Sequence, residues 1–228
     1  MNEISPKKIR LFELLLVVLI PLLPSLISAI YTFCRNQTYD YSNTYSSYAD
    51  YSIVLQSTKQ LLGIALLVYV LFRQGRRIED IGLSFRWMDI PIGIGIYALV
   101  YVVHYALYKS GHHFFPQGDF KAHNLGFVGG SYIVVFIFMF INPFYEELIV
   151  RAYAMTEIEF LSGSKIAAIV ISTLFQSSYH LYQGLFPALL IIPTFLIHSL
   201  YFAKYKRIMP VIIAHLIADM VSMHYHLG

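Results

Sequence analysis

The sequence predicts an all-α membrane protein, a polytopic bundle of transmembrane helices. Hydrophobic residues make up 57% of the 228 residues and charged residues only 13%, whereas an average soluble domain is about 45–50% apolar and about 25% charged. Several apolar stretches reach the roughly 20 residues that a helix needs to cross a bilayer core of about 30 Å. The apolar residues form continuous runs and not the alternating segments of a membrane barrel, which favours helices over strands.

We predict about seven spans, at approximately 11–33, 52–73, 88–108, 128–160, 164–182, 185–203 and 208–224. The first run is too long for the apolar core of a signal peptide, so we interpret it as a retained span. The fourth is too long for one straight crossing. It contains Pro143, which removes a backbone hydrogen bond and clashes with the preceding turn, and we therefore predict a kinked helix.

The distribution of basic residues predicts a cytoplasmic N-terminus. With that orientation, twelve of the sixteen Lys and Arg residues lie in the inner segments, as the positive-inside rule expects. We therefore predict a multi-pass integral membrane protein, located in the plasma membrane if the host is bacterial. In the turn 162–164, Gly163 lies between two serines and joins the fourth and fifth spans. Glu157 and Glu159 beside it are interpreted as a solvated helix end.

The sequence also excludes several partners and cofactors. No basic cluster lies on a soluble domain, so no nucleic-acid partner is expected. No GxxxxGK[ST] or GxGxxG loop is present, so no nucleotide is expected either. Cys34 is the single cysteine, which rules out an internal disulfide framework and a CxxC metal site.

Ionisable residues are concentrated in the second half of the chain, which we take as the functional core (128–228), preceded by N-terminal spans (1–127). Such residues are costly inside a bilayer and mark functional sites unless they are paired. We expect those of the last four spans to share a polar interior: Glu146, Glu147, Arg151, His180, His198, His215 and Asp219. Taken alone, His198 is interpreted as a structural helix–helix contact.

Helical spacing assigns different roles to the two adjacent glutamates. Glu147 and Arg151 are four residues apart, so they share a helix face and are expected to pair. Glu146 is rotated by about 100° from that face, which leaves it free for chemistry. His215 and Asp219 are also four residues apart, and Asp219 is expected to accept from one ring nitrogen of His215 and fix its tautomer.

A hairpin about Gly163 predicts that Glu146 and His180 come level. Glu146 lies seventeen residues before Gly163 and His180 seventeen residues after it, so each is about 25 Å from the turn along a helix. Gln176, one turn before His180, is expected to line the same cavity.

Two kinds of hydrolytic chemistry fit these residues. A buried glutamate can act as the general base for a water molecule, and imidazole donors can hold a developing oxyanion. Alternatively, Glu146, His180 and His215 resemble a zinc set of two histidines and one carboxylate with an open position. The HExxH helix of common zinc proteases and the GxSxG nucleophile motif are both absent. The residues alone leave both routes open, with no cofactor required or zinc as a possible one.

Three motifs in order resemble those of the CAAX-protease and bacteriocin-processing family, also called CPBP or Abi, which is similar to CAAX prenyl protease type 2. "EELIVR", from Glu146 to Arg151, matches its EExxxR motif, and "HLIAD", from His215 to Asp219, matches a His followed four residues later by Asn or Asp. Its FxxxH motif appears as "FQSSYH", in which Gln176 occupies the Phe position before His180. The resemblance covers residues 128–222.

This resemblance implies an intramembrane endopeptidase in which Glu146 activates water with help from Glu147 and Arg151. His180 and His215 would stabilise the oxyanion, and Asp219 would occupy the Asn/Asp position. The substrate would be a peptide or a membrane-associated protein, of CAAX type or a peptide maturing as bacteriocins do. Members of the family are often described as metalloendopeptidases. The alternatives are a non-catalytic bacteriocin-immunity or binding protein and, ranked below it, an ion or proton transporter.

Overall fold

The computed structural model describes residues 6–35, 46–114 and 130–227, and within these ranges the chain is helical and contains no strand. The predicted all-α class is therefore confirmed. Five helices of the described chain are long and apolar enough to cross a membrane. They are α1 (Pro6–Arg35), α2 (Ser46–Arg73), α3 (Asp89–Phe114), the continuous helix Tyr132–Ser162, and α7 (Leu185–Tyr205).

The two remaining predicted spans correspond to the shorter apolar helices, and α6 ends earlier than predicted. α6 (Lys165–Ser178) has 14 residues, which at 1.5 Å per residue is about 21 Å and too short to cross the hydrocarbon core upright. The segment predicted to continue this helix to residue 182 forms a turn followed by the short 3₁₀ helix η4 (Leu181–Gln183). α8 (Met209–Leu227) is the other shorter apolar helix.

The helix Tyr132–Ser162 is the central element. In its 18-residue apolar stretch, 56% of the residues are buried within the protein, whereas the corresponding share for α3 is 11%. It consists of α4 (Tyr132–Glu146), a π-helical segment η3 (Glu147–Tyr153) and α5 (Ala154–Ser162). α4 is helical through Pro143, and a π-helical segment begins four residues later at Glu147. Proline removes one of the bonds that hold the α pattern, and the wider turns of a π-helix are a recognised way to accommodate an irregularity.

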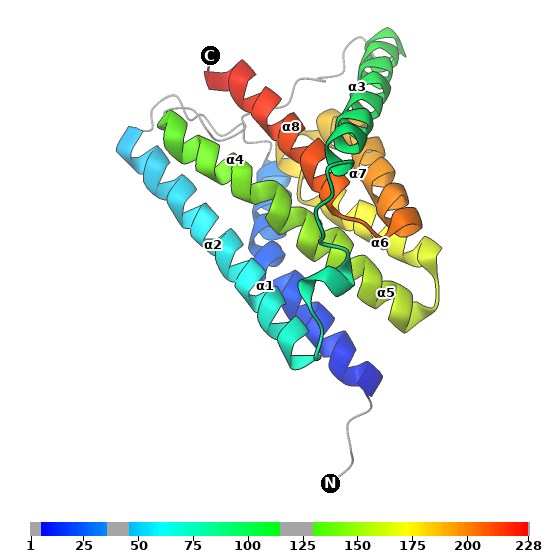
Figure 1. Cartoon of the computed structure of the whole chain (residues 1–228). Coiled ribbons are helices and arrows are strands. Elements are labelled where there is room, and N and C mark those ends of the chain that lie inside the picture. Colours follow the sequence, from blue (N-terminus) through cyan, green and yellow to red (C-terminus); the bar gives the residue numbers. More distant parts are fainter. Residues whose placement is uncertain (1–5, 36–45, 115–129, 228) are drawn as a thin grey trace.

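The other helices surround this central helix (Figure 1). α2 and α8 flank α4, α1 and α6 flank α5, α7 lies against α6, and α3 lies against α8. The predicted turn between α5 and α6 is present, with Gly163 in the left-handed region at φ 70° and Ser164 capping α6 by accepting a hydrogen bond from the backbone of Ala167. Large apolar side chains such as Leu62, Phe72 and Val102 point outward, as a bilayer-facing surface requires.

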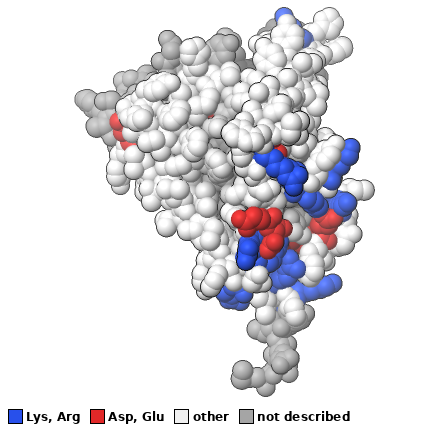
Figure 2. Space-filling model, in the orientation of Figure 1, with Lys and Arg blue, Asp and Glu red and all other residues white. Residues whose placement is uncertain are grey.

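Most charged atoms on the face seen in Figure 2 gather over the connection from α2 to α3 and the neighbouring ends of α5 and α7. Here Arg10 of α1 and Arg76, just after α2, both bind Glu157, through three hydrogen bonds of 2.6–2.7 Å. Glu157 is completely buried, so our interpretation of it as part of a solvated helix end was wrong. Its charge is stabilised by arginines from distant parts of the chain, which the local sequence does not reveal.

Candidate active site within the helix bundle

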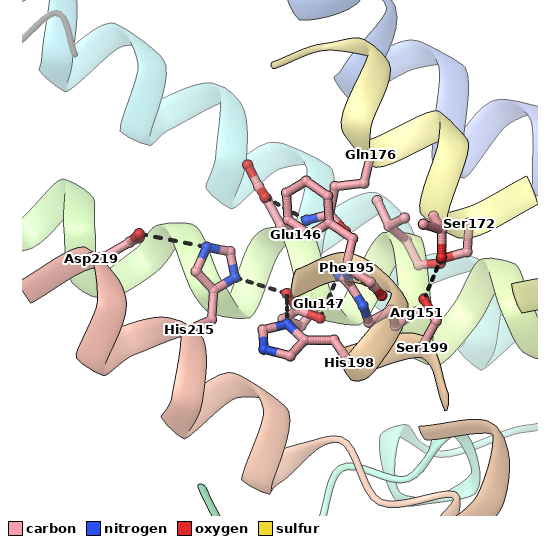
Figure 3. A network of polar contacts seen from close by, with 12 residues as sticks. Glu146, Glu147, Arg151, Ser172, Gln176, Phe195, His198, Ser199, His215 and Asp219 are labelled. Atoms are coloured by element: carbon pink, nitrogen blue, oxygen red, sulfur yellow. Dashed lines mark hydrogen bonds and ion pairs between the residues drawn. The ribbon is translucent and has the colours of Figure 1, made fainter. Parts of the chain in front are cut away.

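The Glu147–Arg151 pair predicted from helical spacing is present. Nη1 of Arg151 donates to Oε2 of Glu147 over 2.7 Å, and both side chains are completely buried. Nη2 of Arg151 also donates to the backbone oxygen of Phe195 on α7, at 3.4 Å. The pair therefore fixes the π-helical segment against α7 (Figure 3).

Both oxygens of Glu147 have partners, because two histidines from other helices approach Oε1, the oxygen that Arg151 does not bind. Nδ1 of His215, on α8, donates to Oε1 of Glu147 over 2.8 Å. Nδ1 of His198, on α7, lies 3.7 Å from the same oxygen. Glu147 is thus the anchor of three helices, and its lone pairs are largely used within the protein.

Glu146 is less constrained than its neighbour. Oε2 of Glu146 accepts a 2.8 Å hydrogen bond from Nε2 of Gln176 on α6, the one side-chain hydrogen bond that the described residues give it. The residue is 8% exposed, whereas Glu147 is completely buried. A carboxylate has about four lone-pair positions, so Glu146 keeps acceptor capacity for a water molecule.

His180 lies just beyond the end of α6 and is tied to Glu146 through Gln176. Nδ1 of His180 donates to the backbone oxygen of Gln176 over 2.9 Å, while the side chain of Gln176 holds Glu146. Because a carbonyl only accepts, the hydrogen of a neutral His180 is on Nδ1 and its Nε2 is an acceptor. The ring of Phe195 packs against the imidazole, with centroids 4.9 Å apart.

Gln176, four residues before His180 and predicted to line the same cavity, is the direct hydrogen-bond partner of Glu146. The arm that carries Glu146 includes the π-helical segment, in which hydrogen bonds span five residues and each turn takes up more of the chain. That arm is therefore shorter than an α-helix of the same number of residues.

His215 lies between two carboxylates. Its Nδ1 faces Glu147, and its Nε2 lies 3.5 Å from Oδ1 of Asp219 on the same helix. The expected proximity of His215 and Asp219 is therefore present, and Glu147 makes the shorter contact. Oδ2 of Asp219 in turn accepts from Nδ2 of Asn142 on α4, at 3.2 Å.

Hydroxyl groups connect the helices behind this network. Ser172 of α6 donates to the backbone oxygen of Val150 within η3 over 3.0 Å, and Thr173 donates to Ser199 of α7 over 3.3 Å. Ser177 instead donates to the backbone of its own helix, as membrane-embedded serines often do. The cross-helix bonds hold α6 and α7 beside the irregular segment of the central helix.

The contacts of the two histidines bear on the zinc hypothesis. The bond from Nδ1 of His180 to a backbone carbonyl leaves its Nε2 as an acceptor, whereas both ring nitrogens of His215 face carboxylates. Among the residues that the structure describes, no group of three or more His, Cys, Asp or Glu side chains is arranged to hold a metal. The zinc set of Glu146, His180 and His215 thus remains a prediction without geometric support.

His198 lies in the polar interior, as expected, in a helix–helix contact beside Glu147, and its ring centroid is 6.3 Å from that of His215. Asn142 was not considered, because only ionisable residues were counted. The signal was available, since an amide in the middle of an apolar span is also costly and needs a partner.

Residues 129–221 match the family model described as type II CAAX prenyl endopeptidase, Rce1-like. The matched segment begins just before α4 and ends within α8, so it contains all the site residues described above. No curated protein and no solved structure gives a significant match to the chain. The match confirms the predicted resemblance to CAAX prenyl protease type 2.

Proposed function

Since residues 129–221 belong to the Rce1-like family of type II CAAX prenyl endopeptidases, we propose that this intramembrane protease hydrolyses its peptide bond with a water molecule activated by Glu146. The observation that carries the proposal is the difference between two adjacent glutamates. Arg151 and His215 occupy both oxygens of Glu147, whereas Gln176 occupies one oxygen of Glu146. Glu146 is the carboxylate with capacity to accept a proton.

In the proposed reaction, the water oxygen forms a bond to the scissile carbonyl carbon while Glu146 takes a proton from the water. Nε2 of a neutral His180 is an acceptor and helps to orient that water. The tetrahedral intermediate then collapses, the C–N bond breaks, and Glu146 returns the proton to the leaving amine. General acid–base catalysis of this kind contributes about 10²–10⁴-fold to a rate.

Stabilisation of the oxyanion is assigned to His215. The contact between Nε2 of His215 and Asp219 is the longer of the two contacts of this ring, at 3.5 Å. Nε2 is therefore the ring nitrogen that can donate to a substrate oxygen. A protonated imidazole aimed at the developing charge acts as a preorganised donor. The short bond to Glu147 keeps the ring oriented, and no step of this mechanism uses a metal.

The decisive experiment compares Glu146→Gln with the wild-type protein in cleavage of a fluorescence-quenched peptide that ends in a CAAX sequence, with and without a prenyl group on its cysteine. We expect a loss of about 10²–10⁴-fold in kcat with little change in thermal stability. Glu159→Gln serves as the matched control, because Glu159 is a partly exposed glutamate on α5 outside the site. Undiminished cleavage by Glu146→Gln would exclude the glutamate mechanism.

The same assay separates this mechanism from the zinc-dependent alternative. Wild-type protein treated with a chelator is expected to keep its activity, and elemental analysis is expected to find less than one metal ion per chain. Loss of activity on chelation, restored by zinc, would favour the metal route instead. The comparisons give no support to an immunity protein or a transporter.

A further inference from the structure

A row of side-chain contacts reaches the site from outside the matched family segment. Nε2 of Gln60, on α2, donates to Oδ1 of Asn142 over 2.7 Å. Asn142 donates to Asp219, Asp219 faces His215, and His215 binds Glu147. We propose that Gln60 is a positioning residue that sets the orientation of Asp219 and His215 through Asn142. This inference rests on the proposed function for its activity readout.

The chemistry of Asn142 gives Gln60 this influence. A carboxamide has an acceptor at one end and a donor at the other, and the two ends are nearly equal in size. The N–H group of Gln60 holds the oxygen end of Asn142, so the NH₂ end points to Asp219. Without that donor, the oxygen end of Asn142 loses its partner, and the side chain can shift away from Asp219.

The contact is short because α2 approaches α4 closely at this level. Gly63, one turn after Gln60, faces the central helix, and a Cβ atom there would lie 2.8 Å from the ring of Tyr145 and 3.1 Å from Pro21. Tyr145 directly precedes Glu146 in the chain. The lack of a side chain at Gly63 thus allows α2 to form a wall beside the site.

Gln60 is a poor candidate for a purely stabilising residue. It is 7% exposed, and its Oε1 atom is buried without a hydrogen-bond partner among the described residues. A buried polar atom without a partner costs free energy, so this amide is not explained by packing alone. Its donor group contributes the specific effect, which is to hold the oxygen end of Asn142 so that the NH₂ end stays against Asp219.

The test compares Gln60→Met with Ser57→Ala in the wild-type background. Methionine keeps the length of the side chain and removes the donor. Ser57 is also buried on α2, but its hydroxyl donates to the backbone of its own helix, so its loss controls for packing. We expect Gln60→Met to lower kcat about tenfold, the effect of losing roughly one hydrogen bond, with KM unchanged, and Ser57→Ala to match the wild type.

A double-mutant cycle identifies the route of the effect. If Gln60 acts through Asn142, the double variant Gln60→Met/Asn142→Leu loses no more activity than Asn142→Leu alone. Losses that multiply would overturn the proposal, and so would a Gln60→Met variant that behaves as Ser57→Ala does. If Gln60→Met does not fold, Gln60→Asn replaces it, because this change withdraws the N–H group by one methylene and keeps an amide in the helix. The same two results, losses that multiply with Asn142→Leu or behaviour like that of Ser57→Ala, would then overturn the proposal.

A spectroscopic readout keeps this inference separate from the proposed function. The ¹⁵N chemical shifts of the His215 ring report which nitrogen carries hydrogen, and they can be measured without substrate. If the wild-type protein cleaves no peptide, the proposed function fails, and a shift change in Gln60→Met but not in Ser57→Ala still supports the positioning role. Unchanged His215 shifts in Gln60→Met would exclude it.

Discussion

Two glutamates of the central helix, Glu147 and Glu157, are both completely buried, but their charges are stabilised in different ways. Glu157 receives three short hydrogen bonds from two arginines, whose side chains are 21–23% exposed. Glu147 has one arginine, itself completely buried, and shares His215 with Asp219. Glu157 therefore has two permanent cations, Arg10 and Arg76. The network of Glu147 contains one arginine and three carboxylates, those of Glu146, Glu147 and Asp219.

This difference separates a structural region from a reactive one. Arginine is effectively always protonated, so Glu157 is held by two permanent cations, and the cluster joins α1, the connection after α2 and α5. Around Glu147 the balance of charge depends on imidazoles and on Glu146, which do exchange protons. Changes at Glu157 should therefore affect stability alone, while changes in the middle of the bundle should affect catalysis or both.

The largest effect on stability is expected for Arg151→Met. Removal of the guanidinium leaves the Glu147 carboxylate buried beside Glu146 with no permanent cation, and breaking a buried pair typically costs about 3–5 kcal/mol. The free energy of unfolding in detergent measures this loss. Glu147→Gln/Arg151→Met, which also removes the buried charge, should recover a large part of it. An Arg151→Met protein as stable as the wild type would show that Glu147 is not held as a charged pair.

A smaller effect is expected for Glu157→Gln. Glutamine keeps one acceptor oxygen for the arginines, and the two arginines are partly exposed and can be hydrated, so the loss should stay below the roughly 3–5 kcal/mol expected for Arg151→Met. The unfolding free energy should fall, while kcat per folded molecule stays within about twofold of the wild type. Glu157 is eleven residues after Glu146, about 16 Å along a helix. A fall in kcat with unchanged stability would contradict the division into two regions.

The smallest effect is expected for Lys206→Gln. Lys206 pairs with Glu159 at the ends of α7 and α5, where the two side chains are 44% and 26% exposed. Exposed pairs of this kind contribute about 0–1 kcal/mol and are screened by salt. Unfolding measured at low and at high salt should differ little between this variant and the wild type. A loss comparable to that of Glu157→Gln would mean that exposure is not what distinguishes the clusters.

Much of the fold and part of the site could be predicted from local sequence patterns. Continuous apolar runs predict helices because a bilayer requires every backbone group to be paired within the segment. The spacing of Glu147 and Arg151 predicts their pairing, because residues four apart share a helix face. Gly163 predicts the turn into α6, because it can adopt a positive φ. Each of these properties depends on a few neighbouring residues.

The contacts between distant residues could not be predicted in the same way. Glu157 looks like an exposed helix end until Arg10 and Arg76 are placed beside it. The hydrogen bond from Gln176 to Glu146 depends on how α6 packs against the central helix, including its π-helical segment. A helical wheel drawn from the sequence does not show which residues of two different helices come into contact.

Hydrophobicity and helical spacing are local properties, so the sequence was enough to predict the class of protein, the approximate positions of most helices and the ionisable residues that meet in its interior. The packing of the bundle established which glutamate is held on both oxygens and that Asn142 belongs to the network. It also brought Gln60, from a helix outside the matched segment, to within 2.7 Å of Asn142. Hydrogen bonds across a bundle depend on the packing of whole helices, which no short stretch of sequence contains.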